Sequence, residues 1–392
     1  MSSPAQLLTV ANFPTGASET LIGPAKPPTL HRFPHLPQLD GFRGVAILLV
    51  LVTHTLETSN VPSKWMIAVG PLGALGVLLF FILSGFLITS LLVAERRETF
   101  GIDLKKFYVR RALRLFPAFF IFLGTVFILV QSHQIAYVSN GEFLACLLYA
   151  RNFYGHSMVL GHIWSLSLEE QFYLCCPFIL RALPINWSFR VAATVASLIA
   201  AFRAIAIHFD LFHPGEPVYY TRPYFRFDSI LVGVCLTMVL VRWPALLDRA
   251  CFALRRLPVG LLWLPLVLWS MFGARYNQSF YQSIQLVLAT ILLGQLVVGH
   301  GRWSQAIFRY SALRYLGKIS YGLYLWQQLF LLARPASWGT WPTFPVWLLA
   351  PLILAALSYR FLESPALRLK CRFEYTPHRP LNLCAYADPR SI

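Results

Sequence analysis

The chain has 392 residues, of which 57% are hydrophobic and 12% are charged, and its mean hydropathy is +0.59. Soluble domains contain about twice this share of charged residues, which excludes a water-soluble globular protein. The formal net charge of +17 fits basic loops on the cytoplasmic side of a membrane and does not indicate a nucleic-acid partner.

The polar N-terminal region comes first in chain order. Residues 1–37 are rich in proline, and the first apolar run follows Arg43, so we expect a disordered cytoplasmic tail rather than a cleavable signal peptide. The remainder divides into a transmembrane domain over 38–370 and a short cytoplasmic C-terminal tail over 371–392. The seven scattered cysteines show no metal-ligand spacing, so neither a disulfide framework nor a metal site is expected.

Ten apolar segments of helical length lie within the transmembrane domain. They predict an all-α integral membrane protein, a bundle of about ten transmembrane helices. A shorter apolar stretch at 142–150 cannot cross a bilayer and is expected to be interfacial or re-entrant. The ten segments fall near 41–57, 73–93, 115–131, 162–181, 190–207, 227–242, 257–273, 281–299, 313–333 and 345–362.

The basic residues predict how these helices are oriented. If the N-terminal tail is cytoplasmic, most of the 33 lysines and arginines lie in cytoplasmic regions, with the greatest density in 94–114. This bias predicts that both termini are cytoplasmic and that the protein crosses the cell inner (plasma) membrane several times. The sequence shows no internal repeat of the kind that many transporters carry.

The first apolar segment, LDGFRGVAILLVLVTH, carries an arginine and a histidine. At about 100° per residue, Arg43 and His54 share one face of a helix and lie about 16 Å apart along its axis. Arg43 is either a positive anchor at the membrane surface or a functional group. His54 is either a core histidine bonded to a neighbouring helix or a general base, because a neutral imidazole accepts a proton near pH 7.

The stretch KKFYVRRALRLFP, residues 105–117, lies in the most basic loop. Arg111 and Arg114 are three residues apart, and Arg110 and Arg114 are four apart, so these side chains are neighbours on a helix. One interpretation is a loop that orients the protein and contacts anionic lipid. The other is a clamp for nucleotide or coenzyme phosphates, to which planar guanidinium groups are well suited.

Two adjacent carboxylates stand early in GHIWSLSLEEQFYLCCPF, residues 161–178. Glu169 and Glu170 point about 100° apart, so one is expected to face the bundle while the other is an interfacial carboxylate in water. The inward carboxylate needs a partner, for which His54 or an arginine would serve. Beside His54, it would raise the basicity of the imidazole and fix its tautomer.

Three further motifs carry weaker signals. The Ser-Gly pair at 84–85 in FFILSGFL predicts close helix packing rather than a nucleophile, because no base is near it in the sequence and GxSxG is absent. FRFDSI sets Arg226 and Asp228 at the head of a span, where we expect them to pair with other charges. Tyr321 stands in the segment 313–333, and Glu363 follows the segment 345–362 near the cytoplasmic face; neither indicates an activity by itself.

Together, these motifs resemble those of the membrane acyltransferase-3 family, which includes bacterial O-antigen and other polysaccharide O-acetyltransferases. They occur in family order from about residue 39 to 369, as LDGFRGVAILLVLVTH, FFILSGFLIT, RRALRLFP, WSLSLEEQFYL, FRFDSILVG, ISYGLYLWQ and YRFLESP. The resemblance implies a bundle of ten spans. It also implies that Arg43 and His54 match the family's arginine and histidine, which are separated by ten residues.

The resemblance further implies roles for other charged residues. The family's cytoplasmic R-x-x-R pair, associated with the acyl-coenzyme A donor, corresponds to Arg111 and Arg114, and we expect Arg110 to assist them. The family's W-x-L-x-x-E motif assigns its important glutamate to Glu169 rather than Glu170.

We therefore expect a membrane-embedded O-acyltransferase that moves an acyl group, by resemblance acetyl, from cytoplasmic acyl-CoA to a hydroxyl of a carbohydrate or glycolipid. The expected catalytic residues are His54, Glu169 and Arg43, with acyl-CoA as a donor substrate and no bound cofactor. Because some family members carry an extracytoplasmic hydrolase-like domain, a separate extracytoplasmic transferase is a conceivable partner. The alternatives are a secondary transporter or flippase that uses the same intramembrane charges, and a noncatalytic membrane scaffold.

Overall fold

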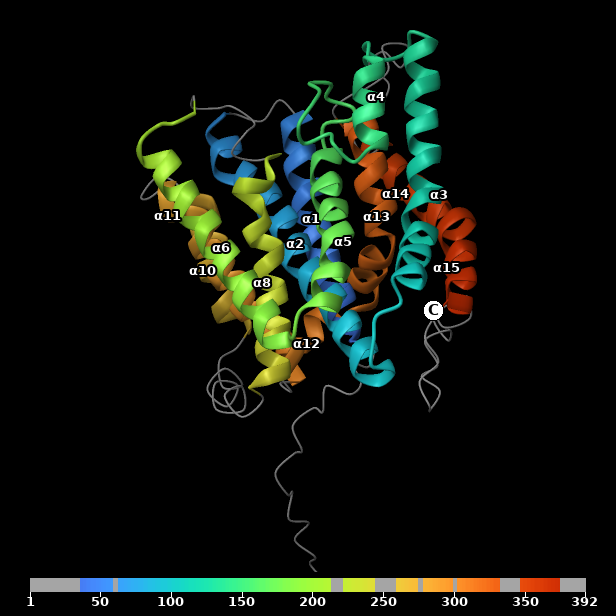
Figure 1. Cartoon of the computed structure of the whole chain (residues 1–392). Coiled ribbons are helices and arrows are strands. Elements are labelled where there is room, and N and C mark those ends of the chain that lie inside the picture. The colour runs from blue at the N-terminus through green and yellow to red at the C-terminus, as the bar shows by residue number, and fades with distance from the viewer. Residues whose placement is uncertain are drawn as a thin grey trace, which may run out of the picture.

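The computed structural model describes residues 36–58, 63–212, 221–243, 259–273, 278–298, 302–331 and 346–373. These residues fold into helices and connections without a β-strand (Figure 1). Nearly all of the predicted N-terminal tail, and residues 374–392 of the C-terminal tail, lie outside the described residues. The predicted domain boundaries therefore stay predictions.

The helices follow one another along the chain with short connections. They are α1 (Pro37–Thr58), α2 (Ser63–Thr99), α3 (Leu104–Gln131), α4 (Asn140–Leu147), α5 (Ile163–Ala182), α6 (Ile185–His208), α8 (Pro223–Arg242), α10 (Val259–Phe272), α11 (Gln278–Val298), α12 (Arg302–Arg309), α13 (Ser311–Leu331), α14 (Val346–Ser358) and α15 (Ser364–Lys370). A π-helical turn, Tyr359–Glu363, joins α14 to α15.

Each of the ten predicted apolar segments corresponds to one helix of the structure. Among the described residues, six helices are long and apolar enough to cross a membrane, so the coarse prediction of a multi-pass membrane protein stands. Charged and amide side chains lower the hydropathy of α5 and α13, and the described parts of α10 and α14 are short. Ten spans therefore stay a prediction. The six candidates are Pro37–Glu57, Val69–Thr99, Leu104–Gln131, Ile185–His208, Pro223–Arg242 and Phe280–Val298.

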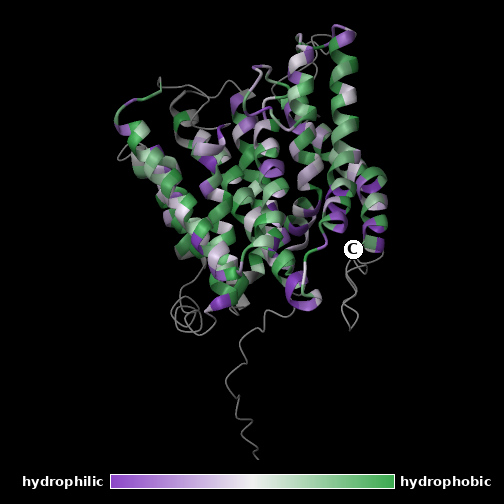
Figure 2. Cartoon of the chain, viewed as in Figure 1, coloured by the Kyte–Doolittle hydropathy of each residue, from purple (hydrophilic) through white to green (hydrophobic). Residues whose placement is uncertain are grey.

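The bundle has two distinct ends. In Figure 1 the connection between α2 and α3 and the short helix α12 lie at the lower end, whereas α4 and the start of α5 lie at the upper end. Hydrophobic residues cover the long outer helices, and hydrophilic residues gather near the ends and within the centre (Figure 2). Helix α1 packs against α2 and α13, and α2 packs in turn against α8. This arrangement puts α1 at the centre of the helices that carry the sequence motifs.

Glycines allow the central helices to approach one another closely. A Cβ atom added at Gly85 of α2 would overlap the carbonyl of Ile230 on α8. A Cβ atom at Gly317 of α13 would overlap the carbonyl of Asp40 on α1. The packing predicted for the Ser-Gly pair is thus confirmed for its glycine, since backbones meet there without a side chain between them.

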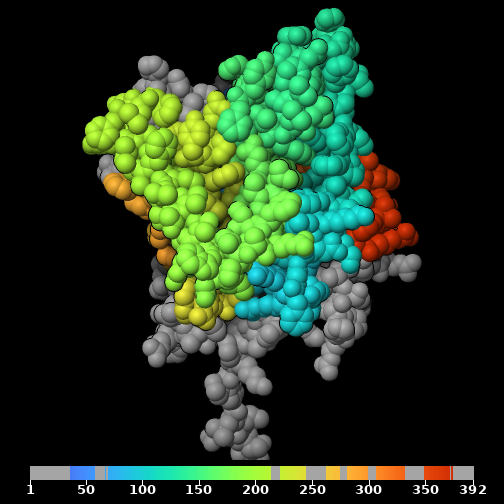
Figure 3. All heavy atoms as spheres, viewed as in Figure 1, coloured from blue at the N-terminus to red at the C-terminus, as the bar shows by residue number. Residues whose placement is uncertain are grey.

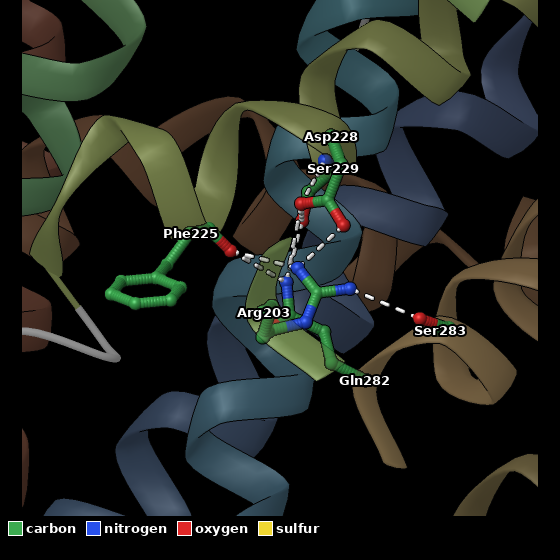
Figure 4. Close-up of polar contacts among 6 residues, drawn as sticks. All are labelled: Arg203, Phe225, Asp228, Ser229, Gln282 and Ser283. Atoms are coloured by element: carbon green, nitrogen blue, oxygen red, sulfur yellow. Dashed lines mark hydrogen bonds and ion pairs between the residues drawn. The ribbon is translucent and has the colours of Figure 1, made fainter. Parts of the chain in front are cut away.

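A buried ion pair joins α6, α8 and α11 (Figure 4). Arg203 donates to the Asp228 carboxylate at 2.6 Å and to the Phe225 carbonyl at 2.8 Å, and its other terminal nitrogen donates to the Ser283 hydroxyl at 3.1 Å. The amide of Gln282 donates to the second oxygen of Asp228 at 3.3 Å. The expectation that Asp228 pairs with another charge is therefore confirmed, and the partner is an arginine from a preceding helix.

A folded segment between α3 and α5 forms the far upper part of the molecule. The short apolar stretch predicted at 142–150 contains most of α4, and α3 and α4 project beyond the other helices (Figure 3). The Glu142 carboxylate accepts the backbone N–H groups of His156 and Ser157, at 2.8 Å and 3.2 Å. Arg151 donates to the carbonyls of Gly155 and Ser157. These bonds replace regular secondary structure in satisfying the backbone of the loop that leads into α5.

Candidate active site

Helix α1 carries both residues of the arginine–histidine motif. It is continuous from Pro37 to Thr58, so Arg43 and His54 share one face as predicted. The Nδ1 atom of His54 lies 3.4 Å from the Oε1 atom of Gln327 on α13. The Nε2 atom of Gln327 donates to the carbonyl of Tyr324, which leaves Oε1 as the acceptor for an Nδ1–H group. His54 is then the tautomer whose Nε2 carries a lone pair.

The Glu169 carboxylate has partners that the sequence analysis did not identify. Ser84 on α2 donates to its Oε1 atom at 3.1 Å, and the Tyr173 hydroxyl lies 3.5 Å from its Oε2 atom. Of the two partners considered for the inward carboxylate, His54 or an arginine, His54 makes no hydrogen bond to Glu169 among the described residues, and Gln327 contacts the imidazole instead. The only sign of these contacts in the sequence is that Ser84 and Gln327 are polar residues within apolar runs, where each needs a hydrogen-bond partner.

The neighbouring carboxylate also faces the protein. Arg111 donates to Oε1 of Glu170 from Nη2 at 2.7 Å and from Nε at 3.1 Å. The same guanidinium lies 3.3 Å from the centre of the Tyr173 ring. The expectation that one of the two carboxylates stays in water is therefore wrong, because α3 packs beside α5 and supplies Glu170 with a cation. Arg111 is held on two sides by this pair of residues.

Arg110 belongs to a different set of contacts. Its guanidinium donates to Glu95 of α2 at 2.9 Å and to the carbonyl of Phe373 at 2.9 Å. The other oxygen of Glu95 accepts the backbone N–H of Asp103 at 2.8 Å. Arg110 thus fastens the connection between α2 and α3, and its predicted part in a phosphate clamp stays a prediction.

Arg114 differs from its two neighbours on α3. It forms no hydrogen bond or ion pair with any described residue, although it lies within electrostatic reach of Arg43, Arg111 and Glu363. Among the described residues, Arg43 makes one ion pair, to Asp40 at 3.6 Å. Two weakly compensated guanidinium groups, one from α1 and one from α3, therefore lie near each other. The two positive charges repel each other, and both side chains are partly buried. An anion that binds between the two guanidinium groups would therefore be stabilised.

The last two motifs border this charged region. The Tyr321 hydroxyl on α13 donates to the carbonyl of Leu115 on α3 at 2.9 Å. Glu363 is buried at the end of the π-helical turn, and it accepts a hydrogen bond from Ser358 at 3.3 Å. Turns of this kind interrupt regular helices and are frequent at functional sites. The motifs thus bring α1, α3, α5, α13 and the π-helical turn together around one set of charges.

A comparison with known families identifies the class of protein. The family model described as an acyltransferase domain matches residues 36–362. This match spans most of the chain and includes the motifs discussed above, except for the end of YRFLESP, where Glu363 is the first residue beyond it. The chain therefore belongs to this acyltransferase family, as the sequence motifs indicated.

Curated relatives are similar over most of this chain. "Putative O-acetyltransferase SACOL0978" of Staphylococcus aureus is 30% identical over 370 residues, covering 84% of this chain and 57% of the relative. "Putative peptidoglycan O-acetyltransferase YrhL" of Bacillus subtilis is 31% identical, covering 86% and 55%. "Peptidoglycan O-acetyltransferase OatA" of Listeria monocytogenes is 29% identical, covering 84% and 56%.

This chain spans a little over half the length of these relatives. No solved structure matches it.

Proposed function

We propose that this protein is a membrane O-acyltransferase that moves an acyl group, acetyl by preference, from acyl-CoA to a carbohydrate hydroxyl. The observation that carries the proposal is the placement of two weakly compensated arginines, Arg43 and Arg114, beside the helix face that bears His54. An anionic donor and a nucleophilic imidazole nitrogen are the two requirements of such a transfer. The named activities of the relatives support the same reaction class.

The arginines form the donor side of the proposed site. Arg114 and Arg43 bind phosphate groups of acyl-CoA, because planar guanidinium groups match phosphate oxygens and neither is saturated by carboxylates. Arg111 is held by Glu170 and Tyr173, so it contributes positive potential from a fixed position. We place the connection between α2 and α3 on the cytoplasmic side, in accord with its many basic residues.

His54 is the proposed centre of the chemistry. The contact with Gln327 fixes the proton on Nδ1 and leaves Nε2 to accept a proton or an acyl group. Glu169, held by Ser84 and Tyr173, counterbalances the arginines near the donor rather than orienting the imidazole. The thioester of the donor would lie between the His54 imidazole and the Glu169 carboxylate.

The proposed acceptor is a carbohydrate on the opposite side of an inner (plasma) membrane. Two of the relatives have peptidoglycan O-acetyltransferase in their names, and peptidoglycan contains sugar hydroxyls. The acyl group passes either straight to such a hydroxyl or to a separate extracytoplasmic transferase. A hydroxyl acceptor requires a base, because the alcohol must lose its proton as the ester bond forms.

The experiment uses the full chain in lipid nanodiscs with acetyl-CoA labelled in its acetyl group and tri-N-acetylchitotriose as the acceptor. We expect release of free CoA and labelled ester with the wild type, and neither product with His54→Ala. Arg114→Gln should raise the KM for acetyl-CoA about tenfold, as expected for one lost charge-assisted bond. Arg190→Gln, which removes an exposed arginine elsewhere, is the matched control and should leave KM unchanged.

Two outcomes would overturn the proposal. A His54→Ala variant that transfers acetyl at the wild-type rate would remove the histidine from the chemistry. A wild-type protein that neither binds nor cleaves acetyl-CoA or a longer acyl-CoA, while exchanging solute across the bilayer without covalent change, would indicate a transporter.

A further inference from the structure

A cavity of about 210 Å³ lies between the start of α6 and the end of α8. Both helix ends are at the lower end of the bundle, as is the connection between α2 and α3 (Figure 1). Arg96, in the last turn of α2, donates to the carbonyls of Leu180 and Leu183, which precede α6, so these contacts agree with the placement. The cavity is therefore on the same side of the membrane as the basic connection.

Helical spacing brings the side chains that line the cavity together. On α8, Met238 and Arg242 are four residues apart and so share one face, and Trp243 follows where that helix ends. Phe189 and Arg190 line the cavity from α6. The rings of Phe189 and Trp243 meet edge to face, with centroids 5.5 Å apart. This contact joins the two helices at the cavity.

The cavity has an apolar floor and a basic rim. Met238 is fully buried, at 0% exposure, whereas Arg190 and Arg242 are exposed. Trp243, at 38% exposure, lies between the floor and the rim in its accessibility. A ligand complementary to this cavity combines an apolar part with a negatively charged group.

The two rim arginines have no carboxylate partner among the described residues. Neither makes an ion pair or a hydrogen bond there, and the guanidinium of Arg190 lies 5.1 Å from the centre of the Trp187 ring. Arg110, at the same end of the bundle, is by contrast bonded to Glu95. Two uncompensated positive charges at one cavity attract an anion, and guanidinium groups match phosphate oxygens.

The membrane itself contains a ligand with this chemistry. An anionic phospholipid has a phosphate next to its acyl chains, and basic pockets between helix ends on the cytoplasmic side bind such headgroups. Trp187, at 55% exposure, and Trp243 stand at the ends of their helices, where tryptophans border the headgroup region of a bilayer. A free phosphate compound without an acyl chain would not cover the apolar floor.

We propose that this cavity binds an anionic phospholipid from the cytoplasmic leaflet, at a site separate from that of the acyl donor. The phosphate lies between Arg190 and Arg242, and the start of an acyl chain lies along Phe189 and Met238. The lipid joins α6 to α8 at one end, and the ion pair between Arg203 and Asp228 joins the same helices toward the other end. Because the lipid binds the folded protein, it also stabilises it.

The test titrates the full chain in detergent micelles with dioleoyl phosphatidylglycerol and counts the bound lipids by native mass spectrometry. We expect one molecule to bind in preference to dioleoyl phosphatidylcholine, which has the same acyl chains and no net charge. Arg190→Gln combined with Arg242→Gln should weaken the apparent affinity about 100-fold, about tenfold for each charge-assisted bond. Arg309→Gln combined with Arg360→Gln, which removes two exposed arginines from other parts of the chain, should leave the affinity within about twofold of the wild type.

A second variant separates the cavity from the charges at its rim. Asn186 lines the cavity one turn before Arg190 on α6, and Asn186→Trp fills the space but keeps both arginines. We expect this variant to bind phosphatidylglycerol about tenfold more weakly than the wild type. Its Tm without added lipid should match that of the wild type, which shows that the protein is folded.

Four results would overturn the inference. Equal binding of the two lipids would remove the charge from recognition, and wild-type affinity in the variant without Arg190 and Arg242 would remove the arginines. Wild-type affinity in Asn186→Trp would place the lipid outside the cavity. Complete displacement of the lipid by glycerol phosphate at the same concentration would make the cavity a site for a free phosphate.

The test is independent of the proposed function. The donor arginines Arg43 and Arg114 lie on α1 and α3, whereas the cavity lies between α6 and α8. Loss of the lipid should therefore leave the KM for acetyl-CoA unchanged. A failure of the lipid site would say nothing against acyl transfer, and a protein without transferase activity would still bind the lipid.

Discussion

The contact between His54 and Gln327 determines which imidazole nitrogen is available for chemistry. The two residues lie on α1 and α13, which pack against each other along their lengths. An amide oxygen fixes the tautomer of a histidine without adding a charge to a site that already contains carboxylates. Gln327 thus fixes the orientation of the imidazole without placing a second charge next to it.

Replacing Gln327 should lower the rate of the chemical step. In Gln327→Leu the Nδ1–H group loses its acceptor, so the imidazole no longer holds one tautomer and one orientation. We expect kcat for acetyl transfer to fall about tenfold to 100-fold with little change in the KM for acetyl-CoA. Steady-state kinetics in nanodiscs provide the measurement.

A glutamine elsewhere in the bundle provides the control for this variant. Gln285 is also buried, and it donates to the hydroxyls of Ser270 and Tyr281 at the contact of α10 and α11. Gln285→Leu removes a comparable amide far from the arginine–histidine motif and should leave kcat unchanged. An equal fall in kcat for both variants would mean that the loss at Gln327 is a loss of packing.

At the scale of elements, the ion pair between Arg203 and Asp228 joins α6 to α8. Both side chains are nearly inaccessible, at 2% and 1% exposure. A buried charge without its partner is strongly unfavourable, particularly within a membrane. We expect Arg203→Met and Asp228→Leu each to lower the free energy of unfolding by about 3–5 kcal/mol.

Combining the two substitutions should relieve part of this loss. Arg203→Met together with Asp228→Leu leaves no unpaired charge, so its loss of stability should be smaller than the sum of the single losses. Thermal unfolding in detergent, followed by tryptophan fluorescence, gives the Tm of each variant. Strictly additive losses would contradict an ion pair that matters to stability.

The loop between α4 and α5 should respond to acid through Glu142. Burial raises the pKa of this carboxyl, but hydrogen bonds from Ser157 and His156 outweigh it and hold the pKa below its usual range. A lowered pKa in the folded state stabilises the loop above the pKa of the unfolded chain, about 4.3, and this stabilisation is lost as the pH falls further.

Hydrogen exchange can follow this acid response. At pH 7 we expect Glu142→Gln to exchange the backbone amides of His156 and Ser157 faster than the wild type, because the charged acceptor is gone. After correction for intrinsic rates, the difference between the two proteins should shrink as the pH falls through the lowered pKa of the Glu142 carboxyl, and it should disappear once that carboxyl is protonated. A difference that persists in acid would show that the charge of Glu142 is not its cause.

For the whole molecule, the positions of the helices could be predicted well from the sequence. The number of helices that cross the membrane could be predicted less well. Helix formation in an apolar segment depends on its own residues, and each of the ten predicted segments is part of a helix. The crossing number depends on neighbours as well. Helices α5 and α13 carry Glu169, Glu170 and two glutamines because other helices satisfy these groups, and this lowers the hydropathy from which spans are recognised.

The residues of the site were predictable, but most of their partners were not. Arg43, His54 and Glu169 could be identified by helical spacing and by the cost of polar groups in lipid. The partner of Glu169 is Ser84, which is 85 positions earlier, and the partner of His54 is Gln327, which is 273 positions later. Such contacts depend on how the helices pack, so they cannot be predicted from the local sequence around either residue.

The bond from Arg110 to the carbonyl of Phe373 has a consequence for topology mapping. It ties the last described residues to the basic connection between α2 and α3, so both lie at one end of the bundle. Alkaline phosphatase and green fluorescent protein are active on opposite sides of a bacterial inner membrane. A fusion made directly after Phe373 should therefore fluoresce, whereas one within the loop after α4 should hydrolyse phosphate esters. The reverse pattern of reporter activity would show that the protein has the opposite orientation in the membrane.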